Sequence, residues 1–162
     1  MLDEPEDTTI PEGSRRVPEE ARLPHPAELA GFAERSFYFS VHVVSACEYL
    51  QRNSGVVRAL AANLLEAGAA VGSHVKEAQA APGLQEATER YTAALRECRK
   101  VVYWLSLLIN SGVKDEPSLR GLHAEGSAIA KVLSKLLTDL LGKEPLAGKK
   151  RDLEIDSELR KL

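Results

Sequence analysis

Apolar residues recur three and four positions apart through most of this 162-residue chain. From residue 28 to residue 142 the spacing is interrupted only by short stretches rich in Gly, Pro, Asn and Ser. Apolar side chains repeated in this way line one face of an α-helix, whereas a half-buried strand alternates every second residue. The pattern therefore predicts long amphipathic helices and no sheet.

Three breaks divide this region into helices of matched length. They are Asn53-Ser54-Gly55, Ala81-Pro82-Gly83 and the stretch from Asn110 to Pro117. The predicted helices cover residues 28–52, 55–80, 84–110 and 117–141, and each is roughly 38 Å long at 1.5 Å per residue. We expect glycines at their carboxyl ends, and Ser54 or Asp115 as amino-terminal caps. Four such helices with short loops predict an all-α, antiparallel up-down-up-down four-helix bundle.

The composition agrees with a helical core. Hydrophobic residues make up 44% of the chain and aromatic residues only 5%, so the core must be built mainly from Ala, Leu and Val. A β-sandwich is disfavoured, because it prefers β-branched and aromatic residues. No apolar run reaches the roughly 20 residues of a transmembrane helix, and the sequence begins with acidic rather than basic residues. Two cysteines cannot form a disulfide framework, and we therefore expect a cytoplasmic protein.

The two ends of the chain lack the helical pattern. Residues 1–27 hold five of the eight prolines and more acidic than basic side chains, which predicts a disordered acidic arm. Residues 143–162 are predicted to form a polar tail that carries the basic cluster Lys149-Lys150-Arg151. A docking peptide around Leu23–Pro26, or docking of the tail to a neighbour or to nucleic acid, is the alternative in each case.

Some apolar residues fall outside the single seam that each helix needs for its own bundle. The third helix has Leu95, Val102 and Ile109 at steps of seven, with Trp104 also off the main seam. The second helix adds Leu65 and Ala69. Contiguous exposed apolar patches usually mark an interface, so these residues predict that the bundle assembles with copies of itself. The alternative is one wide core with a few exposed alanines.

Two segments of the predicted bundle resemble a known family. They are Ala62-Asn63-Leu64-Leu65-Glu66-Ala67 and the third-helix stretch Ala94-Leu95-Arg96-Glu97-Cys98-Arg99, which is followed by Tyr103-Trp104-Leu105-Ser106-Leu107-Leu108. Both are similar to motifs of the bacterial four-helix-bundle family, also called the 23S rRNA intervening-sequence proteins. The resemblance covers about residues 35–141.

The resemblance implies a protomer that assembles into a ring, commonly a homopentamer. Some members of the family are encoded inside inserts of ribosomal RNA genes. The related accessory proteins of diversity-generating retroelements form such rings and bind a reverse transcriptase and RNA. By resemblance, the expected partners are further copies of the chain, and RNA or a reverse transcriptase.

Three polar residues match the family motif, namely Asn63, Glu66 and Glu97. We interpret them as structural, because buried polar groups often fix the register of helices. Asn63 lies beside the seam of the second helix. Glu97 precedes a seam position and requires a partner, for which Arg58, Arg96 and Arg99 are candidates.

Catalytic and metal-binding patterns are absent from the sequence. A di-iron bundle would need Glu-x-x-His on two helices, and none occurs. Zinc-type cysteine spacing, a recognisable nucleophile motif and a Gly-rich phosphate loop are missing as well. We interpret His74 as a core histidine, and Cys47 and Cys98 as small apolar core residues. We therefore expect no enzymatic activity, cofactor, metal, small-molecule substrate or membrane association.

The distribution of basic and acidic side chains indicates where the chain could bind nucleic acid. Residues 31–142 have 12 basic and 11 acidic side chains, and the first 30 residues have 3 and 8. Phosphate binding depends on clustered Lys and Arg, and two clusters occur. These clusters are Arg96-Arg99-Lys100 and Lys149-Lys150-Arg151. The sequence thus favours a non-enzymatic oligomeric scaffold associated with RNA or a nucleic-acid enzyme, with a protein-protein adaptor ring as the alternative.

Overall fold

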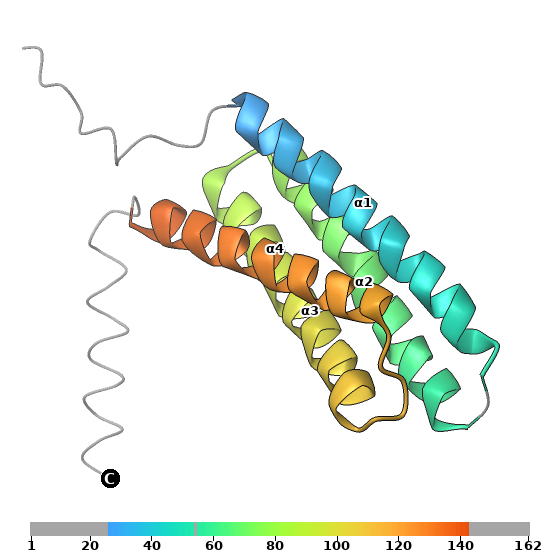
Figure 1. The fold of residues 1–162 in the computed structure, drawn as a ribbon. Coiled ribbons are helices and arrows are strands. Elements are labelled where there is room, and N and C mark those ends of the chain that lie inside the picture. The colour runs from blue at the N-terminus through green and yellow to red at the C-terminus, as the bar shows by residue number, and fades with distance from the viewer. Residues whose placement is uncertain (1–25, 54, 143–162) are drawn as a thin grey trace, which may run out of the picture.

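Four α-helices pack against one another in the computed structural model, which describes residues 26–53 and 55–142 (Figure 1). The helices are α1 (Pro26–Gln51), α2 (Val56–Ala80), α3 (Leu84–Asn110) and α4 (Pro117–Leu141). Consecutive helices run in opposite directions (Figure 1). The predicted all-helical four-helix fold is confirmed, with helix bounds within two residues of the expected ones. The predicted arm, Ser54 and the predicted tail with Lys149, Lys150 and Arg151 lie outside the described residues, apart from the last two arm positions.

The starts of the helices differ from the expected caps. Glu116, not Asp115, is the cap residue of α4, and its side chain makes no capping bond. Pro117 at the first helical position sets the backbone for the helix, since its fixed φ is already helical. Asp115 is held instead by Arg120, whose Nε lies 2.7 Å from one carboxylate oxygen. A paired guanidinium therefore outcompetes the backbone amides for this carboxylate.

Glycine is required in the connections at one end of the bundle. Gly55, before α2, has φ of 61°, and Gly112, after α3, has φ of 70°. Side chains with a Cβ are disfavoured in this left-handed region. The chain can therefore reverse within a few residues at both points.

The first and second helical hairpins share one detail of their packing. Ser40 Oγ of α1 donates to the carbonyl of Gly68 at 2.7 Å and accepts from the N–H of Gly72 at 3.0 Å. The carbonyl of Gly68 and the N–H of Gly72 are four residues apart, and an α-helix normally bonds such a pair to each other.

Cys98 of α3 makes the equivalent bridge to α4. Its Sγ donates to the carbonyl of Gly126 at 3.2 Å and accepts from the backbone N–H of Ala130. Both side-chain-to-carbonyl bonds span 28 residues. The two hairpins are therefore built in the same register.

The core runs the length of the bundle and is mainly aliphatic. Phe39, Leu64, Leu105 and Leu133 are among its largest fully buried side chains. Among the described residues, α2 alone is long and apolar enough to cross a membrane by length and composition, a test that core helices of soluble proteins also pass. Its buried residues, such as Leu64, face the other helices of the bundle.

The four sides of the bundle are not equally closed. Each helix packs extensively on the next one in the chain, whereas α1 and α4 touch over a short stretch. Figure 1 shows α4 crossing the other helices obliquely, so that its carboxyl end lies far from α1. This leaves a groove between α1 and the first turns of α4.

Candidate functional site

The predicted basic cluster of α3 lies in a shallow hollow together with aromatic side chains. The hollow has a volume of about 460 Å³. We call it the α3 hollow, and all of its lining residues come from one helix: Thr92, Leu95, Arg96, Arg99, Lys100, Tyr103 and Trp104. Helical spacing explains the grouping, because residues three and four apart lie next to each other on a helix surface.

Glu97 lowers the charge of the hollow and holds one of its cations. Its carboxylate lies 2.9 Å from Lys100 Nζ and 3.8 Å from Arg96 Nε. Glu97 is buried, so the expectation that it needs a cationic partner is met by Lys100, with Arg96 farther away. Arg58, another candidate, donates to the carbonyl of Asn53 instead. Three cations and one carboxylate leave a local excess of two positive charges.

The cations differ in their freedom to meet a ligand. The side chain of Arg96 is 71% exposed, so its guanidinium remains accessible beside Glu97. Arg99 is exposed and forms no ion pair with any residue that the structure describes. Arg guanidinium groups suit phosphate, since their N–H groups match two oxygens at once.

Tyr103 and Trp104 supply the apolar part of the α3 hollow. Their rings meet edge to face with centroids 5.1 Å apart. Tyr103 is 57% exposed, whereas Trp104 is half-buried and packs against the core. An exposed ring beside arginines is the combination on which bases of single-stranded nucleic acid stack. The sequence predicted the basic residues but not this pairing with Tyr103, which its place four residues after Arg99 could have indicated.

The predicted oligomer-interface residues on α3 are largely covered by the protomer itself. Leu95 is buried in the core, and Trp104 and Ile109 are partly buried against it. Val102 is half-buried, and its Cγ2 lies close to Gly126 of α4. The physical reason at Val102 is that α4 packs against it, so a wider arc of α3 is covered than a single seam predicts. This stripe therefore leaves little free apolar surface.

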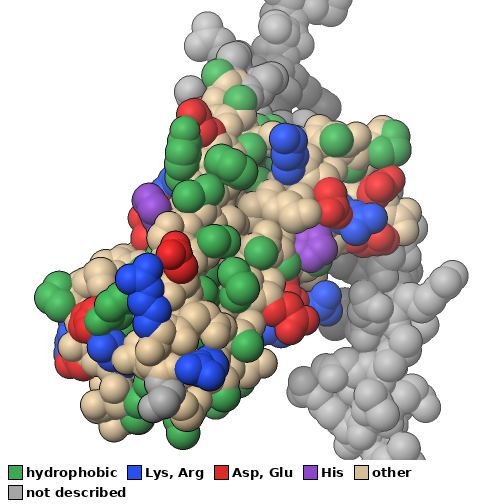
Figure 2. Space-filling view, turned by 90° about the vertical axis from the view of Figure 1, so that its right-hand side faces the viewer, with side chains coloured by type: hydrophobic (Ala, Val, Ile, Leu, Met, Phe, Trp, Pro, Cys, Tyr) green, Lys and Arg blue, Asp and Glu red, His purple; other side chains and the backbone are tan. Residues whose placement is uncertain are grey.

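In contrast to the covered stripe on α3, α1 carries a group of large apolar side chains that are exposed to solvent. They occupy what we call the α1 face: Phe37, Tyr38, Val41 and Val44, which are 58%, 52%, 38% and 47% exposed. Figure 2 shows the side of the molecule on which α1 lies, with hydrophobic side chains gathered near its middle and charged ones around them. Phe37, Val41 and Val44 follow a helical spacing off the main seam, a signal that the sequence interpretation missed.

The two interface residues predicted on α2 lie next to the α1 face. Leu65 is half-buried and Ala69 is exposed. Both lie three or four residues from Gly68 or Gly72, the positions of α2 at which an added Cβ would meet atoms of α1. A Cβ on Gly72 would lie 3.3 Å from the Cα of Phe37, so Phe37 is level with this part of α2. The apolar surface therefore continues from α1 onto α2.

Two of the predicted structural polar residues are exposed within the protomer. Asn63 is exposed, and its amide donates to the carbonyl of Ala59 in its own helix. Glu66 is exposed as well. Within the protomer, only Glu97 of the three is buried.

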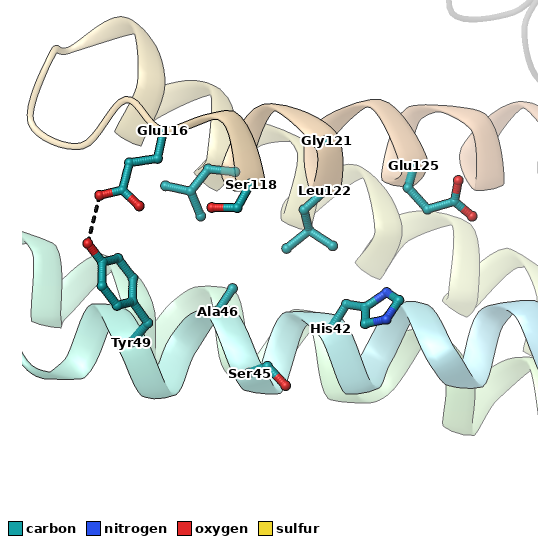
Figure 3. A pocket seen from close by; sticks show the side chains of 10 residues that line it. His42, Ser45, Ala46, Tyr49, Glu116, Ser118, Gly121, Leu122 and Glu125 are labelled. Carbon is teal, nitrogen blue, oxygen red and sulfur yellow. Dashed lines mark hydrogen bonds between the residues drawn. The ribbon is translucent and has the colours of Figure 1, made fainter.

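A second hollow occupies the groove between α1 and α4, with a volume of about 550 Å³. It is closed at one end by a 2.7 Å hydrogen bond from the Tyr49 hydroxyl to Glu116, drawn in Figure 3. At the other end Glu125 accepts two bonds from Arg35, at 2.7 and 3.0 Å. Ser45 points away from α4 in Figure 3.

The carboxylates of this groove are already engaged. The Arg35 bond lowers the pKa of Glu125, and bonds from Tyr49 and then Lys114 lower the pKa of Glu116. Both groups are therefore held charged as bond acceptors, and neither is tuned toward neutral pH as a general acid requires. Among the described residues that line the groove, the Ser45 hydroxyl donates to the carbonyl of Val41 and not to a base.

Neither thiol is placed for chemistry. Burial raises the pKa of Cys47 to about 11 and that of Cys98 to about 12. Reactive cysteines have lowered pKa values, so both thiols behave as protonated core groups. His74 is half-buried, with Nδ1 3.5 Å from Glu77. Among the described residues no three His, Cys, Asp or Glu side chains gather as a metal site would require.

Comparison with known proteins supports the fold. A protein of unknown function from the S23 ribosomal protein family of Bacteroides thetaiotaomicron matches with a TM-score of 0.60 and 22% sequence identity. The match covers 65% of this chain and 97% of that one. The similarity is compatible with a bacterial helical family, and at this identity it concerns the fold alone. No protein-family model matches the chain, and no curated protein matches it.

Proposed function

We propose that this protein is a non-enzymatic, self-associating scaffold that binds single-stranded RNA through the α3 hollow. The observation that carries the proposal is the grouping of Arg96 and Arg99 with Tyr103 in one hollow. Cations meet phosphates there, and an exposed ring offers a base a stacking surface worth about 1–3 kcal/mol. The resemblance to the intervening-sequence family and to retroelement accessory proteins adds support.

Self-association multiplies a modest charge. One protomer offers only a few cations, but a ring would repeat them once per subunit and raise avidity along one strand. We propose that copies meet through the α1 face and the adjoining Leu65 and Ala69. We propose that the assembly is a closed ring, such as a homopentamer. Its second partner would be a reverse transcriptase or another nucleic-acid enzyme.

The test is binding of a fluorescent oligouridine at several salt concentrations. The double substitution Arg96→Glu/Arg99→Glu should weaken binding by about tenfold or more near 0.1 M salt and reduce the log–log salt slope, because each lost phosphate contact contributes about 0.7. The control Lys76→Glu/Lys131→Glu makes the same charge change at exposed sites on α2 and α4. Equal affinities for the two variants would refute the site.

A second candidate function is a protein-protein adaptor without nucleic acid, and the α1 face favours it. Absence of oligouridine binding even at low salt would support the adaptor. Sedimentation of Phe37→Ser/Val44→Ser tests the assembly, since both side chains are exposed and their loss spares the core. A smaller species than the parent chain is expected. An unchanged assembly would place the contact elsewhere.

A further inference from the structure

The most acidic segment of the chain is joined to the end of the bundle from which the α3 hollow can be reached. Residues 3–12 contain Asp3, Glu4, Glu6, Asp7 and Glu12, and no Lys or Arg occurs before Arg15. The segment carries five negative charges within ten residues. It is the only stretch of the chain with such a charge excess.

Charge complementarity favours the α3 hollow as the target of this segment within the bundle. The α3 hollow has an excess of two positive charges, and its Arg99 lacks an ion-pair partner among the described residues. Of the other cations, Arg35, Arg90 and Arg120 pair with carboxylates. Exposed Lys76, Lys131 and Lys135 form no ion pair among the described residues, but the α3 hollow differs from them in grouping two arginines with a lysine.

The length of the connection allows the contact. The amino end of α1 and the amino end of α3 lie at the same end of the bundle (Figure 1). Arg96 and Tyr103 lie about 18 and 29 Å along α3 from Leu84, at 1.5 Å per residue. The residues between Glu12 and Pro26 span up to about 43 Å when extended. α1 and α3 do not pack directly on each other, and two steps of about 8–10 Å between neighbouring helices separate them. The extended connection therefore still reaches Arg96 of its own protomer.

We infer that residues 3–12 occupy the α3 hollow of their own chain and compete with RNA for it. The tether makes a weak contact sufficient, because short flexible linkers give effective concentrations in the millimolar range. Carboxylates pair with Arg96, Arg99 and Lys100, as phosphates would. This inference rests on the proposed function for the choice of site, which is the α3 hollow. The docking of the acidic segment itself requires no RNA.

Trp104 gives a direct test, because it is the single tryptophan of the chain and lines the hollow. We compare acrylamide quenching of the full-length protein with the full-length variant Asp3→Asn/Glu4→Gln/Glu6→Gln/Asp7→Asn/Glu12→Gln. At low salt the variant should be quenched more steeply. The parent chain should approach the variant at about 0.5 M salt, where the Debye length falls to about 4 Å.

Two controls locate the contact. Glu19→Gln/Glu20→Gln removes charge from the arm outside residues 3–12 and should leave quenching unchanged. Lys149→Ala/Lys150→Ala/Arg151→Ala should also leave it unchanged. If the second control reproduces the neutral-arm result, the segment docks on that basic cluster and the inference is wrong. Equal quenching of the parent and the neutral-arm variant would also overturn it.

The outcome is separable from that of the proposed function. If RNA binds the hollow, the neutral-arm variant should bind oligouridine about fivefold or more tightly than the parent, since the competing contact is gone. If neither protein binds RNA but quenching differs, the proposed function fails and the docking stands. If RNA binds both proteins equally and quenching is equal, the docking fails and the proposed function stands.

Discussion

The α1–α2 and α3–α4 hairpins solve the same packing problem with different atoms. In the first, a serine hydroxyl joins Gly68 and Gly72 of the facing helix at 2.7 and 3.0 Å. In the second, the longer thiol of Cys98 joins Gly126 at 3.2 Å and accepts from Ala130. A hydroxyl permits a closer approach than a thiol, because its bonds are shorter.

The clearance at the glycines shows the same difference. A Cβ on Gly68 would lie 2.2 Å from Val43 Cγ1, whereas a Cβ on Gly126 would lie 3.1 Å from Phe39 Cζ and from Val102 Cγ2. The first hairpin is therefore closed tightly and the second more loosely. The comparison teaches that one register can be kept with different room beside the glycines of the facing helix.

The largest expected effect comes from filling the tighter contact. Gly68→Ala should lower the free energy of unfolding by about 2 kcal/mol, since overpacking costs about 1–3 kcal/mol and exceeds the gain in helix propensity. Gly126→Ala should change it by less than about 1 kcal/mol, because a slight shift of a ring and a methyl group offsets that gain. Urea denaturation measures both. Similar losses would mean that the two hairpins are equally close.

Exchanging the bridging atoms sharpens the comparison at a smaller cost. Ser40→Cys should destabilise the protein by about 1–2 kcal/mol, because the larger sulfur is forced between α1 and Gly72. Cys98→Ser should cost about 1 kcal/mol, since the hydroxyl fits without overpacking and its shorter reach only weakens the two bonds. Thermal unfolding, monitored by circular dichroism, shows which of the two variants is less stable. A greater loss for Cys98→Ser would contradict the closer approach in the first hairpin.

The smallest expected effect concerns the link between the hairpins. Arg35 lowers the pKa of Glu125, so the pair contributes stability above the unfolded pKa of Glu, near 4.5, and loses it as the pH falls through the lowered folded value. Both side chains are more than one-third exposed, so solvent screening limits the contribution to about 0.2–1 kcal/mol. Glu125→Gln should therefore be less stable than the parent at pH 7.

The control for the ion pair is its pH dependence. The stability difference between Glu125→Gln and the parent should shrink as the pH falls below 4.5 and through the lowered folded pKa of Glu125, because the parent carboxylate then becomes protonated as well. Urea denaturation at pH 7 and at low pH measures the free energy of unfolding of both proteins. A difference that stays constant with pH would show that Glu125 acts through packing and not through its charge.

Much of the fold was predictable because local patterns define it. Spacing of apolar residues placed all four helices, and Gly and Pro placed their ends. The prediction that Asp115 caps α4 was wrong, because Arg120 competes for its carboxylate. The Ser40 and Cys98 bridges could not be foreseen, since each depends on which residue of a distant helix lies at the same height.

The candidate site was predictable in part. The sequence placed Arg96, Arg99 and Lys100 on one side of a helix, and helical geometry alone guarantees that grouping. It did not reveal the exposed ring of Tyr103 among them or the free apolar side chains of α1. Exposure is a property of the neighbours of a residue, which a one-dimensional pattern does not contain.

The sequence by itself determined four helices, their lengths, their core-facing residues and the separation of charge between the arm and the bundle. The tertiary structure decided which apolar residues remain outside. It buried Leu95 and placed Val102 against Gly126 of α4. It left Phe37, Val41 and Val44 of α1 in solvent. The reason is physical: periodicity fixes the face of a helix that turns inward, while the angle and distance of its neighbours fix how wide a face they cover.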